Sequence, residues 1–241
     1  MSTQLKKWKS PYKNDFYAHF LFKYFMEGKL NKVLSEIKYN QQTIVDVGCG
    51  FGYLLVRLLD KSKKVIGIDQ NTNLQEASNK PFANPNAWNR SYKNLFEVTE
   101  DLIKTEKPES LASLQLVECM AWDTGLPSLS VDVICSLDVL EHILAEKRKE
   151  AISEFSRILK DKGQFIYSVP NTVGPLYKIR CIAARVLGME EDPDTEDHKN
   201  YHWKNELKNL ENKFNIKKIY GYPFKLTQIS PSIIIVCEKR N

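Results

Sequence analysis

Residues 43–54 of the chain read TIVDVGCGFGYL, and this stretch decides the fold. β-Branched residues lead into an acid, Asp46, and then into glycines at positions 48, 50 and 52. An amphipathic segment, 53–59, follows at once. Glycines let the backbone approach a ligand closely, and a helix start behind them offers free N–H groups. The stretch therefore predicts a strand, a glycine turn and a helix, the beginning of a nucleotide-binding α/β unit.

The spacing of the glycines argues against a phosphate ligand. It is G-x-G-x-G and not the G-x-G-x-x-G of a pyrophosphate-binding turn, because position 53 is a tyrosine. Asp46 would face the phosphates of a dinucleotide and repel them, whereas a carboxylate gains Coulomb energy beside a fixed positive centre. S-adenosylmethionine carries a sulfonium and an ammonium but no phosphate, so it is such a ligand.

A second acid indicates an adenosine-type ligand. Residues 64–69, KVIGID, read as a second short buried strand that ends in Asp69, roughly twenty residues after the first glycine. A carboxylate at that strand end can accept both ribose hydroxyls of either cofactor class. Asp69 alone does not separate S-adenosylmethionine from a nicotinamide dinucleotide.

Five ordered motifs between about residue 40 and residue 240 resemble those of class I S-adenosylmethionine-dependent methyltransferases, in particular the ubiquinone-type O-methyltransferases. They are the glycine stretch, Asp69, the segment ECMAWD (118–123), the strand 131–136 after Leu126-Pro127, and the helix end and strand at 159–166. In this family the acid of the third motif bonds the adenine amino group. The resemblance therefore implies S-adenosylmethionine as cofactor, bound by Asp46, Gly48, Cys49, Gly50, Gly52, Asp69, Gln70, Trp122, Asp123 and Ser136.

Alternating periodicities predict an α/β fold with an open sheet. We expect helices over about 14–38, 52–60, 145–160 and 203–213, and strands over about 43–47, 64–68, 114–119, 131–136, 164–169, 215–221 and 231–238. Lys162-Gly163 is expected to close the helix before it. The sheet is Rossmann-like and seven-stranded, mostly parallel, with an antiparallel C-terminal hairpin and helices on both faces.

The chain is expected to form a single methyltransferase domain over 1–241. Residues 1–40 would be an N-terminal helical lid, in which Tyr12 and Tyr17 either pack in the core or close over the sulfonium. Two segments, 71–113 and 170–202, exceed the regular pattern. Segments after strand ends form the walls of clefts in such sheets, so we interpret both as substrate-side insertions.

Composition limits the location and the partners. The net charge of +5 is spread along the chain, so a nucleic-acid partner is possible but not favoured. The five cysteines include no C-x-x-C pair and are expected to be reduced core thiols. The apolar run at 233–237 is too short to span a bilayer. We expect a cytoplasmic protein; the sequence carries no indication of its oligomeric state.

The residues expected to carry chemistry follow the fourth strand. Asp138, Glu141 and His142 lie three and four residues apart, so one helical turn would present them on one side. Methyl transfer needs an aligned in-line attack and removal of a proton from the nucleophile. His142 is the leading candidate for that base, because a histidine titrates near neutral pH. Glu141 and the later His198 complete the candidate catalytic set.

The same Asp-x-x-Glu-His element leaves a metal site open. It resembles the element of ubiquinone-type O-methyltransferases and, with Glu in place of Asp, that of small-RNA terminal ribose 2′-O-methyltransferases. The RNA enzymes bind a divalent metal there, which would put Mg²⁺ or Mn²⁺ on Asp138, Glu141, His142 and His198. Roles without a metal are favoured, and His202 is a weaker candidate ligand than His198.

The function expected from the sequence is methyl transfer from S-adenosylmethionine to a small-molecule acceptor, at a hydroxyl. One alternative is a metal-assisted RNA ribose 2′-O-methyltransferase, and another is a non-catalytic cofactor-binding partner subunit. A nicotinamide-dependent oxidoreductase is disfavoured by Asp46 and by the G-x-G-x-G spacing.

Overall fold

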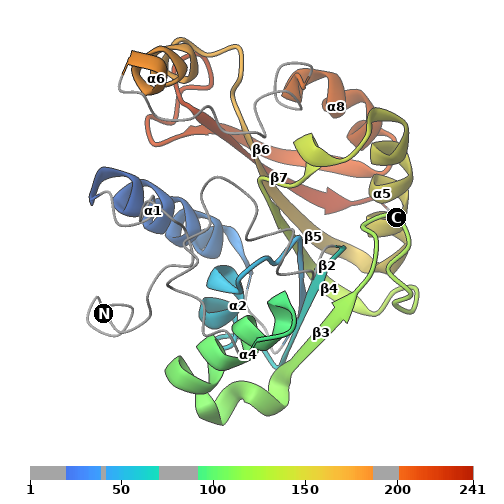
Figure 1. The fold of residues 1–241 in the computed structure, drawn as a ribbon. Helices are drawn as coiled ribbons and strands as arrows, with labels where there is room; N and C mark the ends of the chain where they lie inside the picture. Colours follow the sequence, from blue (N-terminus) through green and yellow to red (C-terminus); the bar gives the residue numbers. More distant parts are fainter. Residues whose placement is uncertain (1–19, 39–41, 71–91, 187–200, 241) are drawn as a thin grey trace.

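The computed structural model describes residues 20–38, 42–70, 92–186 and 201–240, and these form one seven-stranded sheet (Figure 1). The strand order is β3-β2-β1-β4-β5-β7-β6. Neighbours among the first five strands run parallel, and β7 pairs antiparallel with both β5 and β6. The strands are β1 (Thr43–Val47), β2 (Lys64–Asp69), β3 (Leu114–Glu118), β4 (Val131–Leu137), β5 (Leu159–Pro170), β6 (Phe214–Tyr222) and β7 (Ser232–Lys239). The predicted Rossmann-like sheet and its antiparallel C-terminal hairpin are confirmed.

Helices cover both faces of the sheet (Figure 1). Because successive strand residues point to opposite faces, Ile44 and Val45 of β1 belong to two different core clusters. The Ile44 cluster joins the sheet to α1 (Phe20–Glu36), α2 (Tyr53–Leu58) and α4 (Leu95–Glu106). The Val45 cluster joins it to α5 (Ala145–Ile158) and α8 (Trp203–Glu211).

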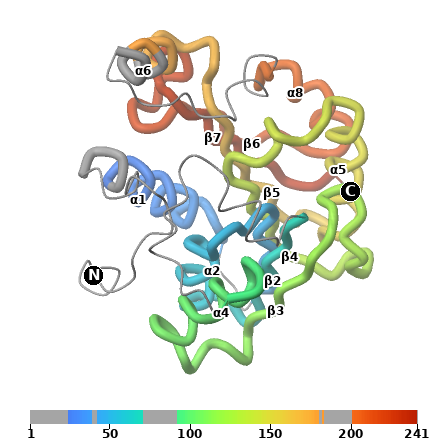
Figure 2. The backbone as a smooth tube through the Cα atoms, in the orientation of Figure 1, coloured from blue at the N-terminus to red at the C-terminus, as the bar shows by residue number. Residues whose placement is uncertain are grey.

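Helix α6 (Pro175–Val186) stands apart from these two layers, beside the turn between β6 and β7 (Figure 2). The Asn171 side chain, just after β5, donates to the carbonyl oxygens of Thr227 at 2.7 Å and Ser230 at 2.8 Å. Two short 3₁₀ helices, η1 (Pro108–Ser113) and η2 (Leu140–His142), precede β3 and follow β4. Within the described ranges, no helix is both long enough and apolar enough to cross a membrane.

The expected closure of a helix at Lys162-Gly163 is wrong. Helix α5 ends at Ile158, and both residues lie inside β5. Val131 pairs with Leu159 and Val133 with Gln164, so residues 160–163 form a bulge opposite the single residue between the two β4 positions. Lys162 takes a positive φ of 57° in this bulge. The Lys-Gly pair therefore marks a left-handed backbone position at Lys162, within a strand and not at a helix end.

The segments interpreted as lid and insertions are described in part. Residues 1–19, 71–91 and 187–200 lie outside the described residues, and with them Tyr12, Tyr17 and His198. The described helix of the N-terminal segment packs into the core, where Val33 is fully buried. Helix α4, from the second half of 71–113, buries Leu102 and Ile103 in the same core cluster.

Candidate functional site

The glycine turn after β1 is held against the end of β2. The backbone N–H groups of Gly48 and Cys49 both donate to the Ile68 carbonyl oxygen, at 2.8 and 3.0 Å. Gly48, Gly50 and Gly52 all have positive φ, of 70°, 50° and 80°. L-residues with a Cβ rarely adopt these values, so three glycines in alternation allow a tight turn between β1 and α2.

Two of these glycines have opposite surroundings. A Cβ on Gly48 would lie 2.4 Å from Cγ2 of Val139, in the loop after β4, so Gly48 is required by close approach. A Cβ on Gly50 would meet no described atom within 4 Å. Thr99 of α4 fixes the turn from the other side, because its hydroxyl donates to the Gly50 carbonyl oxygen at 3.1 Å. The turn is therefore rigid but leaves space beside Gly50.

Two acids lie near this turn. Asp69 Oδ2 accepts a hydrogen bond from the Gly50 N–H at 3.0 Å. Asp46 at the end of β1 is only 3% exposed. Burial, and then the nearby charge of Asp69, raises the pKa of Asp46 well above its ordinary value. A cationic group beside these acids would stabilise their ionised forms and so lower the pKa of Asp46 again.

The residues predicted to hold the adenine lie in the turn after β3. The Asp123 N–H donates to the Met120 carbonyl oxygen at 3.1 Å, which closes this turn, and the Asp123 side chain is exposed. Trp122 is half-buried, with the Lys147 ammonium 5.8 Å from its ring centroid. The turn adjoins β2, because the Cys119 N–H donates to the Asp69 carbonyl oxygen at 3.1 Å.

Three further residues predicted to contact the cofactor differ in their exposure and in the hydrogen bonds of their side chains. Gln70 is exposed directly after Asp69. The Cys49 thiol is buried, and burial, with the charges of Asp46 and Asp69, raises its pKa well above the ordinary value, so the thiol stays protonated at neutral pH. Ser136 in β4 is fully buried, and its hydroxyl has no hydrogen-bond partner among the described residues.

The expectation that one helical turn presents Asp138, Glu141 and His142 together is wrong. Asp138 has a positive φ of 55° and lies outside η2, which begins at Leu140. Its carboxylate binds the Lys29 ammonium through Oδ2 and accepts from the Ser168 hydroxyl through Oδ1 at 2.8 Å. Glu141 is 2% exposed, and its charge adds to burial in raising the pKa of Tyr201. His142 is half-buried.

Metal ligation is not supported by the described part of the chain. No group of three or more histidine, cysteine or acidic side chains there could hold a metal ion. Both carboxylate oxygens of Asp138 are engaged by protein groups, and His198 lies outside the described residues. His202 instead caps a helix, since its Nδ1 accepts from the Lys204 N–H at 3.2 Å at the start of α8.

Lys29 is the residue of this region that the sequence interpretation missed. It lies in the middle of α1 and is 2% exposed, although it carries a charge. A signal was present, because Lys29 falls four residues before Val33 and next to Leu30, on the apolar stripe of the helix. A charged residue on such a stripe indicates a buried partner.

Comparison with known proteins assigns the region that contains the glycine turn to a protein family. A model of the methyltransferase domain family matches residues 45–167, slightly more than half of the chain. An uncharacterized methyltransferase of Oceanobacillus iheyensis is 22% identical over 138 residues, which are 57% of this chain and 51% of that protein. The chain thus matches about half the length of this curated relative.

Solved structures show the same fold over almost the whole chain. A protein of Pyrococcus horikoshii superposes with a TM-score of 0.63 at 13% identity, covering 94% of this chain and 96% of that one. An S-adenosylmethionine-dependent methyltransferase of Aquifex aeolicus superposes with a TM-score of 0.59 at 15% identity, covering 98% and 97%. At such identities the likeness establishes the fold.

Proposed function

Because the chain belongs to the methyltransferase domain family, we propose that it transfers a methyl group from S-adenosylmethionine to a hydroxyl of a small-molecule acceptor. The observation that carries this proposal is the glycine turn, with an open position beside Gly50, Asp69 bonded to the Gly50 N–H, and the buried acid Asp46 interacting with Asp69. Asp46 would repel a pyrophosphate, and both acids favour a cation. This chemistry suits S-adenosylmethionine and not a dinucleotide.

The cofactor would be held along the ends of the first three strands. Gly48, Gly50 and Gly52 supply the close backbone approach, and Asp69 has the acceptor oxygens that ribose hydroxyls need. Trp122 and Asp123 would contact the adenine, with Cys49, Gln70 and Ser136 as the remaining proposed neighbours. When bound, S-adenosylmethionine supplies an electrophilic methyl group.

The protein's own part in the reaction is to hold the acceptor and to remove its proton. We assign proton removal to His142 in η2, since a partly exposed imidazole can both meet an acceptor and pass the proton to solvent. Glu141, buried next to it, and His198 are proposed to assist. Asp138 takes no proton in this scheme, because Lys29 keeps it ionised.

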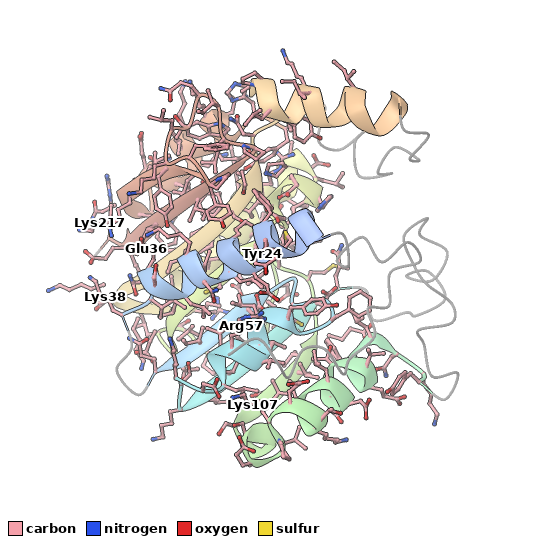
Figure 3. All side chains as sticks on the ribbon, turned by 90° about the vertical axis from the view of Figure 1, so that its left-hand side faces the viewer. Tyr24, Glu36, Lys38, Arg57, Lys107 and Lys217 are labelled. Carbon is pink, nitrogen blue, oxygen red and sulfur yellow. The ribbon has the colours of Figure 1, made fainter. Side chains whose placement is uncertain are left out.

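A small acceptor is favoured over a nucleic acid by the pairing of surface charges. Lys217 binds Glu238 at 2.9 Å, and Lys218 binds Glu36 at 2.7 Å, near the carboxyl end of α1 (Figure 3). Lysines neutralised in this way contribute little to the dense basic face that a phosphate backbone requires.

Transfer of a labelled methyl group to a panel of phenols, alcohols and carboxylic acids tests the proposal. We expect a product with an oxygen-bound methyl group, and His142→Ala should lower kcat by about 10²–10⁴-fold while the affinity for S-adenosylmethionine stays within about twofold. Labelling of RNA only, or of a nitrogen or carbon acceptor only, would contradict the acceptor class. Full activity of His142→Ala would contradict the assignment of the base.

A further inference from the structure

A buried charge joins the N-terminal helix to the loop after β4. The ammonium of Lys29, from the middle of α1, binds Oδ2 of Asp138, the first residue after β4. The Lys29 side chain is 2% exposed and that of Asp138 is 34% exposed. A buried ammonium without a counter-charge is strongly unfavourable. The position of α1 in the core therefore fixes the position of the Asp138 carboxylate.

The carboxylate of Asp138 is fixed from the sheet side as well. Ser168 of β5 donates through its hydroxyl to Oδ1 at 2.8 Å, and its carbonyl oxygen accepts from the Asp138 N–H at 2.8 Å. These contacts hold Asp138 at its positive φ of 55°, a backbone conformation that is unfavourable for most residues with a Cβ. Burial raises the pKa of Asp138, but the charges of Lys29 and His142 and the hydrogen bonds from Lys29 and Ser168 outweigh it and lower the pKa.

The loop that begins at Asp138 touches both halves of the proposed site. The next residue, Val139, packs so closely on Gly48 that no Cβ fits there. The His142 N–H donates to the Val139 carbonyl oxygen at 3.0 Å, so the 3₁₀ turn starts from the same residue. A shift at Asp138 therefore moves the wall of the glycine turn and the proposed base together.

We infer that the Lys29–Asp138 pair is a positioning contact, through which α1 fixes the loop after β4 and so sets the cofactor-binding turn and His142. The inference rests on the proposed function, because it takes the glycine turn as the cofactor site. Lys29 acts through Asp138 and Val139, without touching the reacting atoms. It makes α1, a helix outside the family match at 45–167, part of the catalytic domain.

The chain offers a control at the carboxyl end of the same helix. Glu36 of α1 accepts from Lys218 of β6 at 2.7 Å, and Lys218 is 59% exposed. This pair also ties α1 to the sheet, and further side-chain partners of Glu36 are Lys32 of α1 and Tyr220 of β6. Lys218→Met therefore loosens α1 without changing the environment of Asp138.

The test compares Lys29→Met, Asp138→Asn, the double variant and Lys218→Met in the full chain. The affinity for S-adenosylmethionine is measured by calorimetry, the stability by thermal unfolding, and the exposure of amides 139–142 by hydrogen exchange. We expect Lys29→Met to weaken binding by about tenfold and to accelerate exchange at 139–142. Lys218→Met should leave both at wild-type values.

The double variant separates positioning from stability. It contains no unpaired buried charge, so its thermal stability should recover relative to Asp138→Asn, which leaves the buried Lys29 ammonium unpaired, whereas the affinity should stay reduced because nothing ties the loop to α1. Affinity that recovers together with stability, or wild-type exchange at 139–142 in Lys29→Met, would overturn the inference. A wild-type chain that binds no S-adenosylmethionine would contradict the proposed function instead, and the exchange measurement would still decide the inference.

Discussion

The glycine turn would select a cation because two acids, Asp46 and Asp69, lie near it. Asp46 is almost fully buried at the end of β1, with the charge of Asp69 nearby. Burial and the charge of Asp69 both disfavour the ionised form of Asp46, so two ionised carboxylates at this place are unfavourable in the free protein. A bound sulfonium or ammonium offsets the repulsion between the two carboxylates, and this attraction adds to the affinity for a cation.

This arrangement predicts that the affinity for S-adenosylmethionine rises with pH. The pKa of Asp46 is raised in the free protein, so the site is protonated above the ordinary value of 3.8 and must release a proton when a cation binds. We expect affinity to increase until the pH passes the raised pKa. Calorimetry in two buffers of different ionisation enthalpy measures the released proton.

Asp46→Asn is the control for this pH dependence. Because a raised carboxyl pKa means stability lost as the pH rises from 3.8 through the raised value, the Asn variant should melt at a higher temperature than the wild type at neutral pH. It should also bind S-adenosylmethionine more weakly and without proton release. A variant that still binds with the same pH profile would show that Asp46 is not the titrating group.

Gly48 and Gly50 should respond differently to the same substitution. Gly48→Ala places a Cβ 2.4 Å from Val139 Cγ2, so we expect a loss of about 1–3 kcal/mol in the free energy of unfolding as well as weaker cofactor binding. Gly50→Ala meets no described atom and should lose about 1–2 kcal/mol through its positive φ alone. Its methyl group would occupy the proposed ligand space, so its affinity should fall at least as far. Unchanged affinity in Gly50→Ala would move the ligand away from this turn.

Removal of divalent metal should have no effect on binding or turnover. The carboxylate of Asp138, one of the four candidate ligands, is engaged by Lys29 and Ser168. We therefore expect methyl transfer in the presence of excess EDTA to equal that with added Mg²⁺ or Mn²⁺. Activity that disappears with EDTA and returns with Mn²⁺ would instead favour the metal-assisted alternative.

At the scale of elements, the bulge in β5 is the feature that departs most from expectation. A Cβ on Gly163 would lie 2.8 Å from the Lys160 carbonyl oxygen and 3.1 Å from that of Asp132, and backbone atoms cannot move aside easily. The bulge therefore depends on Gly163 for space and on Lys162 for its left-handed turn. Neither requirement involves the end of α5.

Two substitutions in the bulge test this explanation by denaturant unfolding. Gly163→Ala should lower the free energy of unfolding by about 1–3 kcal/mol. Lys162→Gly should leave it unchanged or raise it by about 1 kcal/mol, because glycine adopts a positive φ without the strain of a Cβ. A fully stable Gly163→Ala variant would contradict the close packing of the bulge.

For the molecule as a whole, the sequence predicted the number of strands, the mostly parallel sheet and its antiparallel hairpin, because strands can be identified from local patterns. The strands β1, β2 and β4 are short, mostly apolar runs, and the glycine turn and Asp69 come at the ends of β1 and β2. The Lys29–Asp138 contact was not predictable in this way, because 109 residues separate its partners and only the packing of α1 brings them together. Cofactor residues next to strand ends were therefore easier to identify than the contacts between α1 and the loop after β4.

A calorimetric titration of S-adenosylmethionine into the wild-type chain and into Asp69→Ala, with NADH as the competing cofactor class, decides whether the glycine turn binds the methyl donor. We expect one-to-one binding to the wild type, a loss of at least about tenfold in Asp69→Ala, and no binding of NADH. Asp60→Ala is the control, because Asp60 is a partly exposed acid that pairs with Lys107. Binding of NADH, or equal affinity for S-adenosylmethionine in the wild type and Asp69→Ala, would contradict the assignment of the glycine turn to the methyl donor.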